Sequence, residues 1–298
     1  MNKTQLEDKV FKNFSNTRSK LLFPAIGILI IIVIVFFIND SFTVNSYIEI
    51  QKDLFYYLNS ILSTFPVLQF NLTQLGNPLI FLGLLTIFII YAPRFWEVML
   101  TSTIISSLIS FILKIIFDIP RPAVFLDNES FVIIGEILEG YKSMPSGHSI
   151  STFTVITILL IAFMPKKLNH RILWSFFIIF IGLIIAFSRV GVGAHYPLDV
   201  VIGSTIGYIS SIIGILLHNK FNWWKWIKKE KYYPIIMLFL IIWAIAIVYE
   251  LTFNNLLIFY FSLLSLITTF YLISQIKASQ KNKGEAMKVS SKKKPKDS

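Results

Sequence analysis

Four short polar stretches, far apart in the chain, carry the residue types that can bind a phosphate group and attack its phosphorus. They are Lys114 with Arg121-Pro122, Pro145-Ser146-Gly147-His148, Ser188-Arg189, and His195 with Asp199. Each stretch lies where an apolar segment begins or ends, so all four can gather at one face of a membrane. Cations, histidines and a carboxylate are costly to keep in so apolar a protein, and this cost indicates that they have a function.

The first stretch pairs two cations. Lys114 and Arg121 are seven residues apart, close to two helical turns, so both can point along one helix face. Pro120 and Pro122 restrict the backbone around Arg121 and are expected to end the helix near Asp118. Arg121 can then present its planar guanidinium group to phosphate oxygens. Lys114 alone could simply extend its ammonium group to the membrane surface.

The second stretch precedes an apolar segment over residues 149–164. Ser146 is a natural N-cap, and Gly147 allows a backbone to approach a ligand closely. The free amides at such a helix start bind anions, which would place His148, in the first turn, next to a bound phosphate. Taken alone, Ser146 could be a plain cap and His148 an interfacial polar residue.

The last two stretches surround a short loop. Gly191 and Gly193 make the segment between Arg189 and His195 flexible enough to fold inward. Asp199 follows His195 by four residues and can therefore accept a hydrogen bond from the imidazole. Such a bond would fix the tautomer and stabilise a positively charged ring, as in nucleophilic catalysis. The alternative is that Asp199 only complements a helix dipole.

A metal site is the other common use of two histidines and carboxylates. The acidic residues in and near the segment between Pro122 and Pro145 are Asp118, Asp127, Glu129, Glu136 and Glu139. They lack the spacing of metal ligands, and three nearby cations would repel a divalent ion. We therefore expect no metal and no other cofactor. The chain has no cysteine, so thiolate chemistry is excluded.

The elements that position these residues are membrane helices. The chain has 298 residues, of which 55% are hydrophobic and 14% charged, and its mean hydropathy is +0.71. A membrane-spanning helix needs about 20 apolar residues. The predicted spans are 21–38, 76–93, 97–117, 149–164, 172–188, 199–217, 234–250 and 256–274. The fold class is thus an all-α, polytopic transmembrane bundle of about eight helices, since the apolar runs are continuous and not alternating as in a β-barrel.

The charge pattern predicts how the bundle is oriented. The net charge is +11, and with a cytoplasmic N-terminus all but five of the 27 Lys and Arg residues lie on the cytoplasmic side. The five exceptions are Lys52, Lys114, Arg121, Lys142 and Arg189. Both termini are therefore expected in the cytoplasm, with the four polar stretches on the outer face of a bacterial cytoplasmic membrane. We find no sign of a nucleic-acid-binding surface.

Residues 54–70 are apolar enough to suggest a ninth span, but a crossing there would place most of the later cations outside. We predict instead an amphipathic helix at the outer interface, with an ordinary loop as the alternative. The chain then divides into a basic head (1–20), a core (21–217), a loop with two additional helices (218–274) and a basic tail (275–298). The tail, from Lys277 onward, is expected to be disordered.

Together the four stretches resemble the three-part signature of the type 2 phosphatidic acid phosphatase superfamily, which also includes vanadium haloperoxidases. The matching residues are Lys114-x6-Arg121-Pro122, Pro145-Ser146-Gly147-His148, and Ser188-Arg189-x5-His195-x3-Asp199. The resemblance is strong over about residues 100–220 and implies a six-helix lipid phosphatase core. The last two spans extend beyond that core.

The resemblance also implies a role for each residue. His195 would attack phosphorus to give a phosphohistidine, Asp199 would orient His195, and His148 would protonate the leaving oxygen and then activate water. The phosphate would be held by Lys114, Arg121, Ser146, Gly147 and Arg189. The implied enzyme is a metal-independent lipid phosphatase.

The lipid itself is left open by the sequence. Undecaprenyl diphosphate is favoured because its recycling is a common task of bacterial members, with phosphatidylglycerophosphate, phosphatidate and lipid A as alternatives. A lipid-to-lipid phosphotransferase would use the same residues with another acceptor. A transporter or lipid-binding protein with an anion site is a third possibility, although transporters usually place polar groups in broken helices at mid-membrane.

Overall fold

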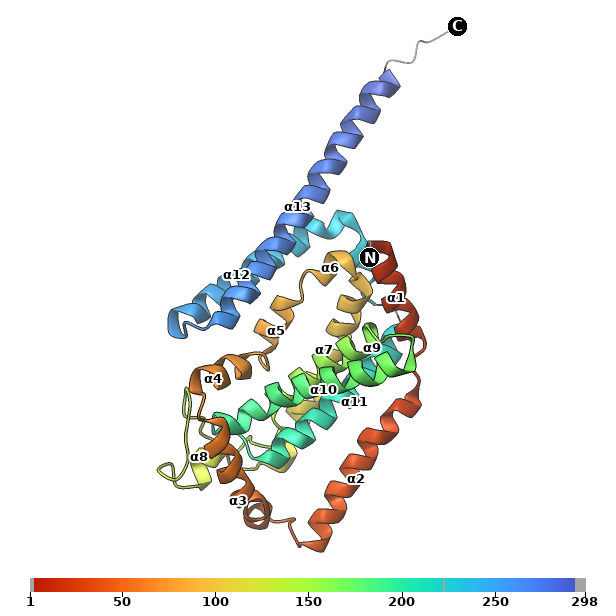
Figure 1. Cartoon of the computed structure of the whole chain (residues 1–298). Helices are drawn as coiled ribbons and strands as arrows, with labels where there is room; N and C mark the ends of the chain where they lie inside the picture. The colour runs from red at the N-terminus through yellow and green to blue at the C-terminus, as the bar shows by residue number, and fades with distance from the viewer. Residues whose placement is uncertain (1–2, 222, 293–298) are drawn as a thin grey trace.

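The computed structural model describes residues 3–221 and 223–292, and within them it is helical and contains no strand (Figure 1). Six of the described helices are long and apolar enough to cross a membrane. They are α2 (Phe23–Ile38, preceded by a short 3-10 turn), α7 (Pro93–Phe117), α10 (Leu168–Gly191), α11 (Pro197–Phe221), α12 (Tyr233–Phe253) and α13 (Leu257–Lys292). A shorter apolar helix, α9 (Gly147–Ala162), lies among them. The prediction of an all-α membrane bundle is confirmed.

The predicted span 76–93 is wrong as a single helix. It consists of α5 (Pro78–Leu84) and α6 (Phe88–Tyr91), separated by a turn. Thr86 in this turn donates a hydrogen bond to the Gly83 carbonyl oxygen (3.0 Å), which competes with the regular helical pattern. Hydropathy alone cannot detect this interruption, because the residues around Thr86 are all apolar.

The two C-terminal helices pack against this broken segment, beside it in Figure 1. Hydroxyl groups of α13 satisfy its backbone: Ser262 donates to the Ile80 carbonyl (3.1 Å) and Ser265 to the Leu84 carbonyl (2.9 Å). Thr269 donates to the Thr86 hydroxyl (3.1 Å). In a membrane interior such bonds replace the water that an interrupted helix would otherwise need.

The centre of the bundle is α11, which packs closely on α9 and α7. The contact is close because glycines face the neighbouring helices. A Cβ atom added at Gly207 would lie 2.3 Å from the Ile150 carbonyl oxygen, and one added at Gly203 would lie 2.7 Å from that of Ser146. The backbones of α9 and α11 are therefore in direct contact along the segment that leads to the four polar stretches.

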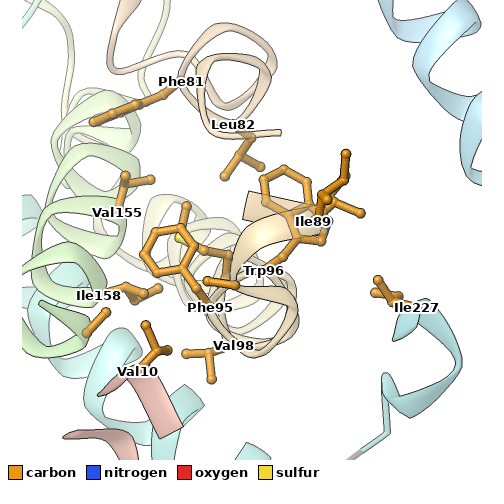
Figure 2. Close-up of a cluster of buried hydrophobic side chains, with 14 of the residues drawn as sticks. Val10, Phe81, Leu82, Ile89, Phe95, Trp96, Val98, Val155, Ile158 and Ile227 are labelled. Atoms are coloured by element: carbon orange, nitrogen blue, oxygen red, sulfur yellow. The ribbon is translucent and has the colours of Figure 1, made fainter. Parts of the chain in front are cut away.

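One end of the bundle, called here the α1 end, is closed by a polar network. The helix α1 (Lys3–Ser15) contributes Glu7, which pairs with Lys228 at 2.7 Å. Glu97 is buried and pairs with His218 at 3.2 Å, and it also lies 3.8 Å from Lys228. Val10 of α1, Phe95 of α7 and Ile158 of α9 pack in one apolar cluster (Figure 2). These contacts tie the N-terminal helix to α7, α9 and α11.

The opposite end is covered by residues 43–77, called here the strap. The strap comprises α3 (Val44–Leu62), which begins with a capping box at Thr43, and α4 (Pro66–Gln74). The predicted amphipathic helix over 54–70 is thus helical but divided, because Pro66 starts a new helix after the turn at Ser63–Phe65. Neither strap helix is among the candidate spans of the described chain. The short helix α8 (Pro122–Phe125) lies at the same end (Figure 1).

The predicted disorder of the tail from Lys277 is wrong for residues 277–292, where α13 continues as a helix. This stretch is rich in Lys, Gln, Ala, Glu and Met, which favour helix, and it contains no proline. Residues 293–298 lie outside the described part of the chain.

The glycine contacts predict a local sensitivity of the bundle. Gly207→Ala should lower the free energy of unfolding by about 1–3 kcal/mol, because its methyl group forces the α9 backbone away. Thermal unfolding in detergent measures the effect. Gly27→Ala on α2 is the matched control, since a Cβ there has no neighbour within 4 Å. Equal melting temperatures for both variants would contradict the close packing of α9 and α11.

Candidate functional site

The structure brings the eight predicted site residues together under the strap. They come from the end of α7 and the turn after it (Lys114, Arg121), the start of α9 (Ser146, Gly147, His148), and the junction of α10 and α11 (Arg189, His195, Asp199). The three cations are close enough to both histidines to act on them electrostatically. Helix ends far apart in sequence thus form one positively charged cluster, called here the pocket.

His195 lies between a cation and a carboxylate. Its Nδ1 atom is 3.5 Å from Asp199 Oδ2, and its Nε2 atom is 3.3 Å from Arg121 Nη1. An arginine can only donate, so Nε2 accepts in this contact and the proton of a neutral ring belongs on Nδ1. Nε2 is therefore the ring atom with a lone pair directed into the cationic pocket.

The surroundings of His195 favour its uncharged form. Burial lowers the pKa of His195 well below its ordinary value, and the positive charges of Arg121 and Arg189 lower it further. A neutral imidazole is the form that can act as a nucleophile. The surroundings thus favour the neutral imidazole of His195 at neutral pH.

Asp199 is fully buried and accepts three hydrogen bonds from different parts of the chain. Tyr47 of α3 donates at 2.6 Å, Ser143 at 2.6 Å, and the backbone N–H of Tyr196 at 3.0 Å. Burial raises the pKa of the Tyr47 hydroxyl, and the charge of Asp199 raises it further, so Tyr47 remains a donor. These donors fix the carboxylate beside His195.

Arg189 is held by the strap. Its Nη1 atom donates to the Thr73 hydroxyl at 2.6 Å. Its Nε atom is buried and has no hydrogen-bond partner among the described residues. A buried guanidinium N–H without an acceptor is costly, and an anion in the pocket would supply that acceptor.

Lys114 and Arg121 reach the pocket in a way that differs from the prediction. The helix α7 ends at Phe117, and Asp118 adopts a left-handed conformation (φ 44°), so the two cations do not share a continuous helix face. Arg121 is held instead by hydrogen bonds of its backbone N–H to Gly140 (3.1 Å) and of its side chain to the Ala194 carbonyl (3.3 Å).

The start of α9 is fixed on both sides. Ser146 caps the helix by accepting a hydrogen bond from the Ser149 N–H, and its own N–H donates to the Asp199 carbonyl (3.0 Å). His148, in the first turn, packs against the strap backbone: a Cβ added at Gly76 would lie 2.6 Å from the Cβ of His148. The site of a Cβ on Gly147 is 3.6 Å from Lys114 Nζ, so the cation and the helix start face each other.

Sequence reasoning missed four residues that hold the predicted ones in place. They are Tyr47, Thr73 and Gly76 of the strap, and Ser143 in the loop before α9. A signal was present only for Tyr47, which recurs with Gln51, Phe55 and Asn59 at four-residue spacing on the buried face of α3. Within the described residues, no three His, Asp or Glu side chains lie close enough to share a metal ion.

A match to a family model supports the resemblance noted in the sequence. Residues 95–223 match the model of the PAP2 superfamily. A crystal structure of Aquifex aeolicus LpxE aligns with a TM-score of 0.46 and 24% sequence identity, over 56% of this chain and 95% of that one. No curated protein matches the chain.

The bond from Tyr47 to Asp199 predicts a positioning role for Tyr47. Tyr47→Phe should lower kcat about 10-fold and move the acid limb of the pH profile to higher pH, because Asp199 with one donor fewer stabilises a protonated His195 more strongly. The melting temperature should fall as well. Tyr57→Phe, an exposed tyrosine on the same helix, is the control and should leave all three quantities unchanged. A lower melting temperature with no shift of the acid limb would show that Tyr47 is merely structural.

The lowered pKa of His195 predicts a pH dependence. Above its pKa the ring is neutral and can attack, so kcat/KM should persist below about pH 6.5, the ordinary pKa of histidine. Because Arg121 helps to lower this pKa, Arg121→Gln should move the acid limb to higher pH in addition to reducing the rate. The substrate titrates identically in both assays, so the shift reports the protein. An unchanged limb would contradict the coupling of Arg121 to His195.

Proposed function

Residues 95–223 make the chain a member of the PAP2 superfamily, and from this membership we propose that it is an integral-membrane phosphatase that acts on a lipid through a phosphohistidine intermediate. The matched family indicates a hydrolase of phosphate esters, and the apolar helices indicate a multi-pass membrane protein. We further propose which residues carry out the reaction, which lipid is the substrate, and how the protein is oriented in the membrane.

The observation that carries the proposal is the contact of His195 Nε2 with Arg121 inside a pocket of three cations. A neutral imidazole with its lone pair among cations is suited to attack a phosphate anion. The Nε atom of Arg189, which has no hydrogen-bond partner among the described residues, is suited to bind such an anion. Charge that develops on the phosphoryl oxygens in the transition state would meet donors that are already in place. The free amides at the start of α9 would add to this stabilisation.

The proposed reaction has two steps. First, His195 Nε2 forms a bond to phosphorus while the bond from phosphorus to the lipid oxygen breaks. His148, protonated in the presence of the negatively charged phosphate, gives that oxygen a proton. Asp199 stabilises the positive ring through Nδ1. In the second step His148 takes a proton from water, the water oxygen attacks phosphorus, and the N–P bond breaks to release inorganic phosphate and free His195.

The arrangement of charges supports an active site outside the cytoplasm. The basic head, the loop after α9 and the basic residues after α11 lie at the α1 end, as the contacts of Asn13 with the Ala162 and Met164 carbonyls and of Glu7 with Lys228 indicate. The proposed site lies at the other end. The positive-inside rule then assigns the α1 end to the cytoplasm of a bacterial cell and the strap to the exterior.

The favoured substrate is undecaprenyl diphosphate, on the associational ground that many bacterial members recycle it. Phosphatidylglycerophosphate, phosphatidate and lipid A remain the alternatives. The apolar faces of the spans would accept any long chain and do not discriminate between these lipids.

Phosphate release by the purified protein in detergent tests the proposal. We expect release from undecaprenyl diphosphate in the presence of EDTA, and its loss, by at least about 1000-fold, in His195→Ala and in His148→Ala. A rapid acid-free quench with labelled substrate should trap the phosphoryl group on His195. His170→Ala, on the α1-end side of α10 and away from the pocket, is the matched control.

Each outcome of this assay has a distinct meaning. Turnover by His195→Ala would refute the nucleophile, and turnover by His148→Ala would refute the acid and base. Phosphate that appears on a second lipid and not in solution would identify a phosphotransferase. Complete inhibition by EDTA would contradict the metal-independent mechanism.

A further inference from the structure

A cavity of about 300 Å³ opens beside His148 and extends away from the strap, between α7 and α9. Lys114 and His148 form its end next to the proposed site, and Gly76 and Pro78 form one side. His195 does not line it. The cavity is therefore on the side of His148, the proposed proton donor, and not on the side of the nucleophile.

Serine hydroxyl groups line the cavity along the membrane helices. Ser110 and Ser107 of α7 lie four and seven residues before Lys114 and share its helix face. At about 1.5 Å per residue they lie about 6 and 10 Å deeper in the membrane than Lys114. Ser151 lies one turn beyond His148 on the facing wall. A polar lining thus continues from the phosphate pocket toward the bilayer interior.

Two of these hydroxyls are free to bind a ligand. A serine within a membrane helix usually donates to a backbone carbonyl of the preceding turn, as Ser106 does to Thr103 (3.0 Å) and Ser151 to Gly147 (3.1 Å). The hydroxyl groups of Ser107 and Ser110 make no hydrogen bond within the described part of the chain. Ser110 also faces the same point as Lys114, because its Oγ atom is 3.8 Å from the site of a Cβ on Gly147.

The geometry of attack on phosphorus determines which part of the substrate would occupy the cavity. In a phosphoryl transfer the attacking and leaving atoms are roughly in line, on opposite sides of phosphorus. With His195 as nucleophile, the leaving group departs toward His148 and thus into the cavity. Unbonded hydroxyls and an ammonium group match acceptor oxygens, whereas a bare hydrocarbon would leave them unsatisfied.

We propose that the Ser107–Ser110 cavity is a leaving-group subsite for lipids that carry hydrogen-bond acceptor oxygens immediately beyond the scissile oxygen. These oxygens can belong to a second phosphate, as in a polyprenyl diphosphate, or to a glycerol or sugar head group. This inference rests on the proposed function and narrows its substrate class. Simple alkyl phosphates, whose leaving group is a plain alcohol, are poor substrates of such a site.

The test compares kcat/KM of the full-length protein in detergent for three lipids. Undecaprenyl diphosphate carries a second phosphate, phosphatidylglycerophosphate carries glycerol oxygens, and dodecyl phosphate carries no such group. The wild type should prefer at least one of the first two over dodecyl phosphate. Ser107→Ala/Ser110→Ala should reduce this preference ratio by about 10- to 100-fold, since each lost hydrogen bond costs about a factor of ten.

The controls separate this inference from the proposed function. Ser175→Ala on α10, a serine outside the cavity, should leave the ratio unchanged, and the two single variants provide the measurement if the double variant unfolds. Loss with the diphosphate alone identifies the second phosphate as the ligand, and loss with phosphatidylglycerophosphate alone identifies glycerol oxygens. An unchanged ratio in an active double variant overturns the subsite and leaves the phosphatase standing. Failure of the wild type to cleave any of the three lipids, or phosphatidate or lipid A, refutes both.

Discussion

The buried carboxylate of Asp199 is the constraint on which the proposed site depends. A carboxylate deprived of water is strongly unfavourable unless donors surround it, and here the donors come from α3, from the loop before α9 and from the start of α11. Each of these segments must therefore be in place for the others to be stable. The same carboxylate faces His195, so the contacts that fold this end of the bundle also orient the imidazole ring.

The three cations of the site lie at one end of the closely packed helices α9 and α11. Lys114, Arg121 and Arg189 repel one another, and only close helix contacts can hold them together without a bound anion. Those contacts are provided by glycines of α11, which bring its backbone against α9. The additional pair of C-terminal helices supports the bundle from another side, because hydroxyls of α13 replace the hydrogen bonds that the interrupted segment α5–α6 lacks.

The predicted site residues could be found from the sequence because each lies at the end of an apolar segment, in short motifs with characteristic spacing. Tyr47, Thr73 and Ser143 could not, since they contact their partners across 152, 116 and 56 residues and no local period links them. The apolar spans were predictable from hydropathy, except where hydroxyl-to-backbone bonds interrupt a helix, as at Thr86. Helical spacing predicted that Lys114 and Arg121 share one helix face. This prediction was wrong, because Asp118 between them adopts a left-handed conformation and ends the helix.

The strap also has a consequence for how the protein is made. Its helices emerge from the ribosome well before the residues with which they form hydrogen bonds. Tyr47 bonds to Asp199, Gln51 to the backbone of Leu198, and Asn59 to the backbone of Val190. Until α11 is inserted, the strap is an amphipathic segment with unpaired polar groups at the membrane surface. A nascent chain that lacks α11 would therefore have the strap but not Asp199, so the proposed reaction could not begin until the last part of the site is inserted.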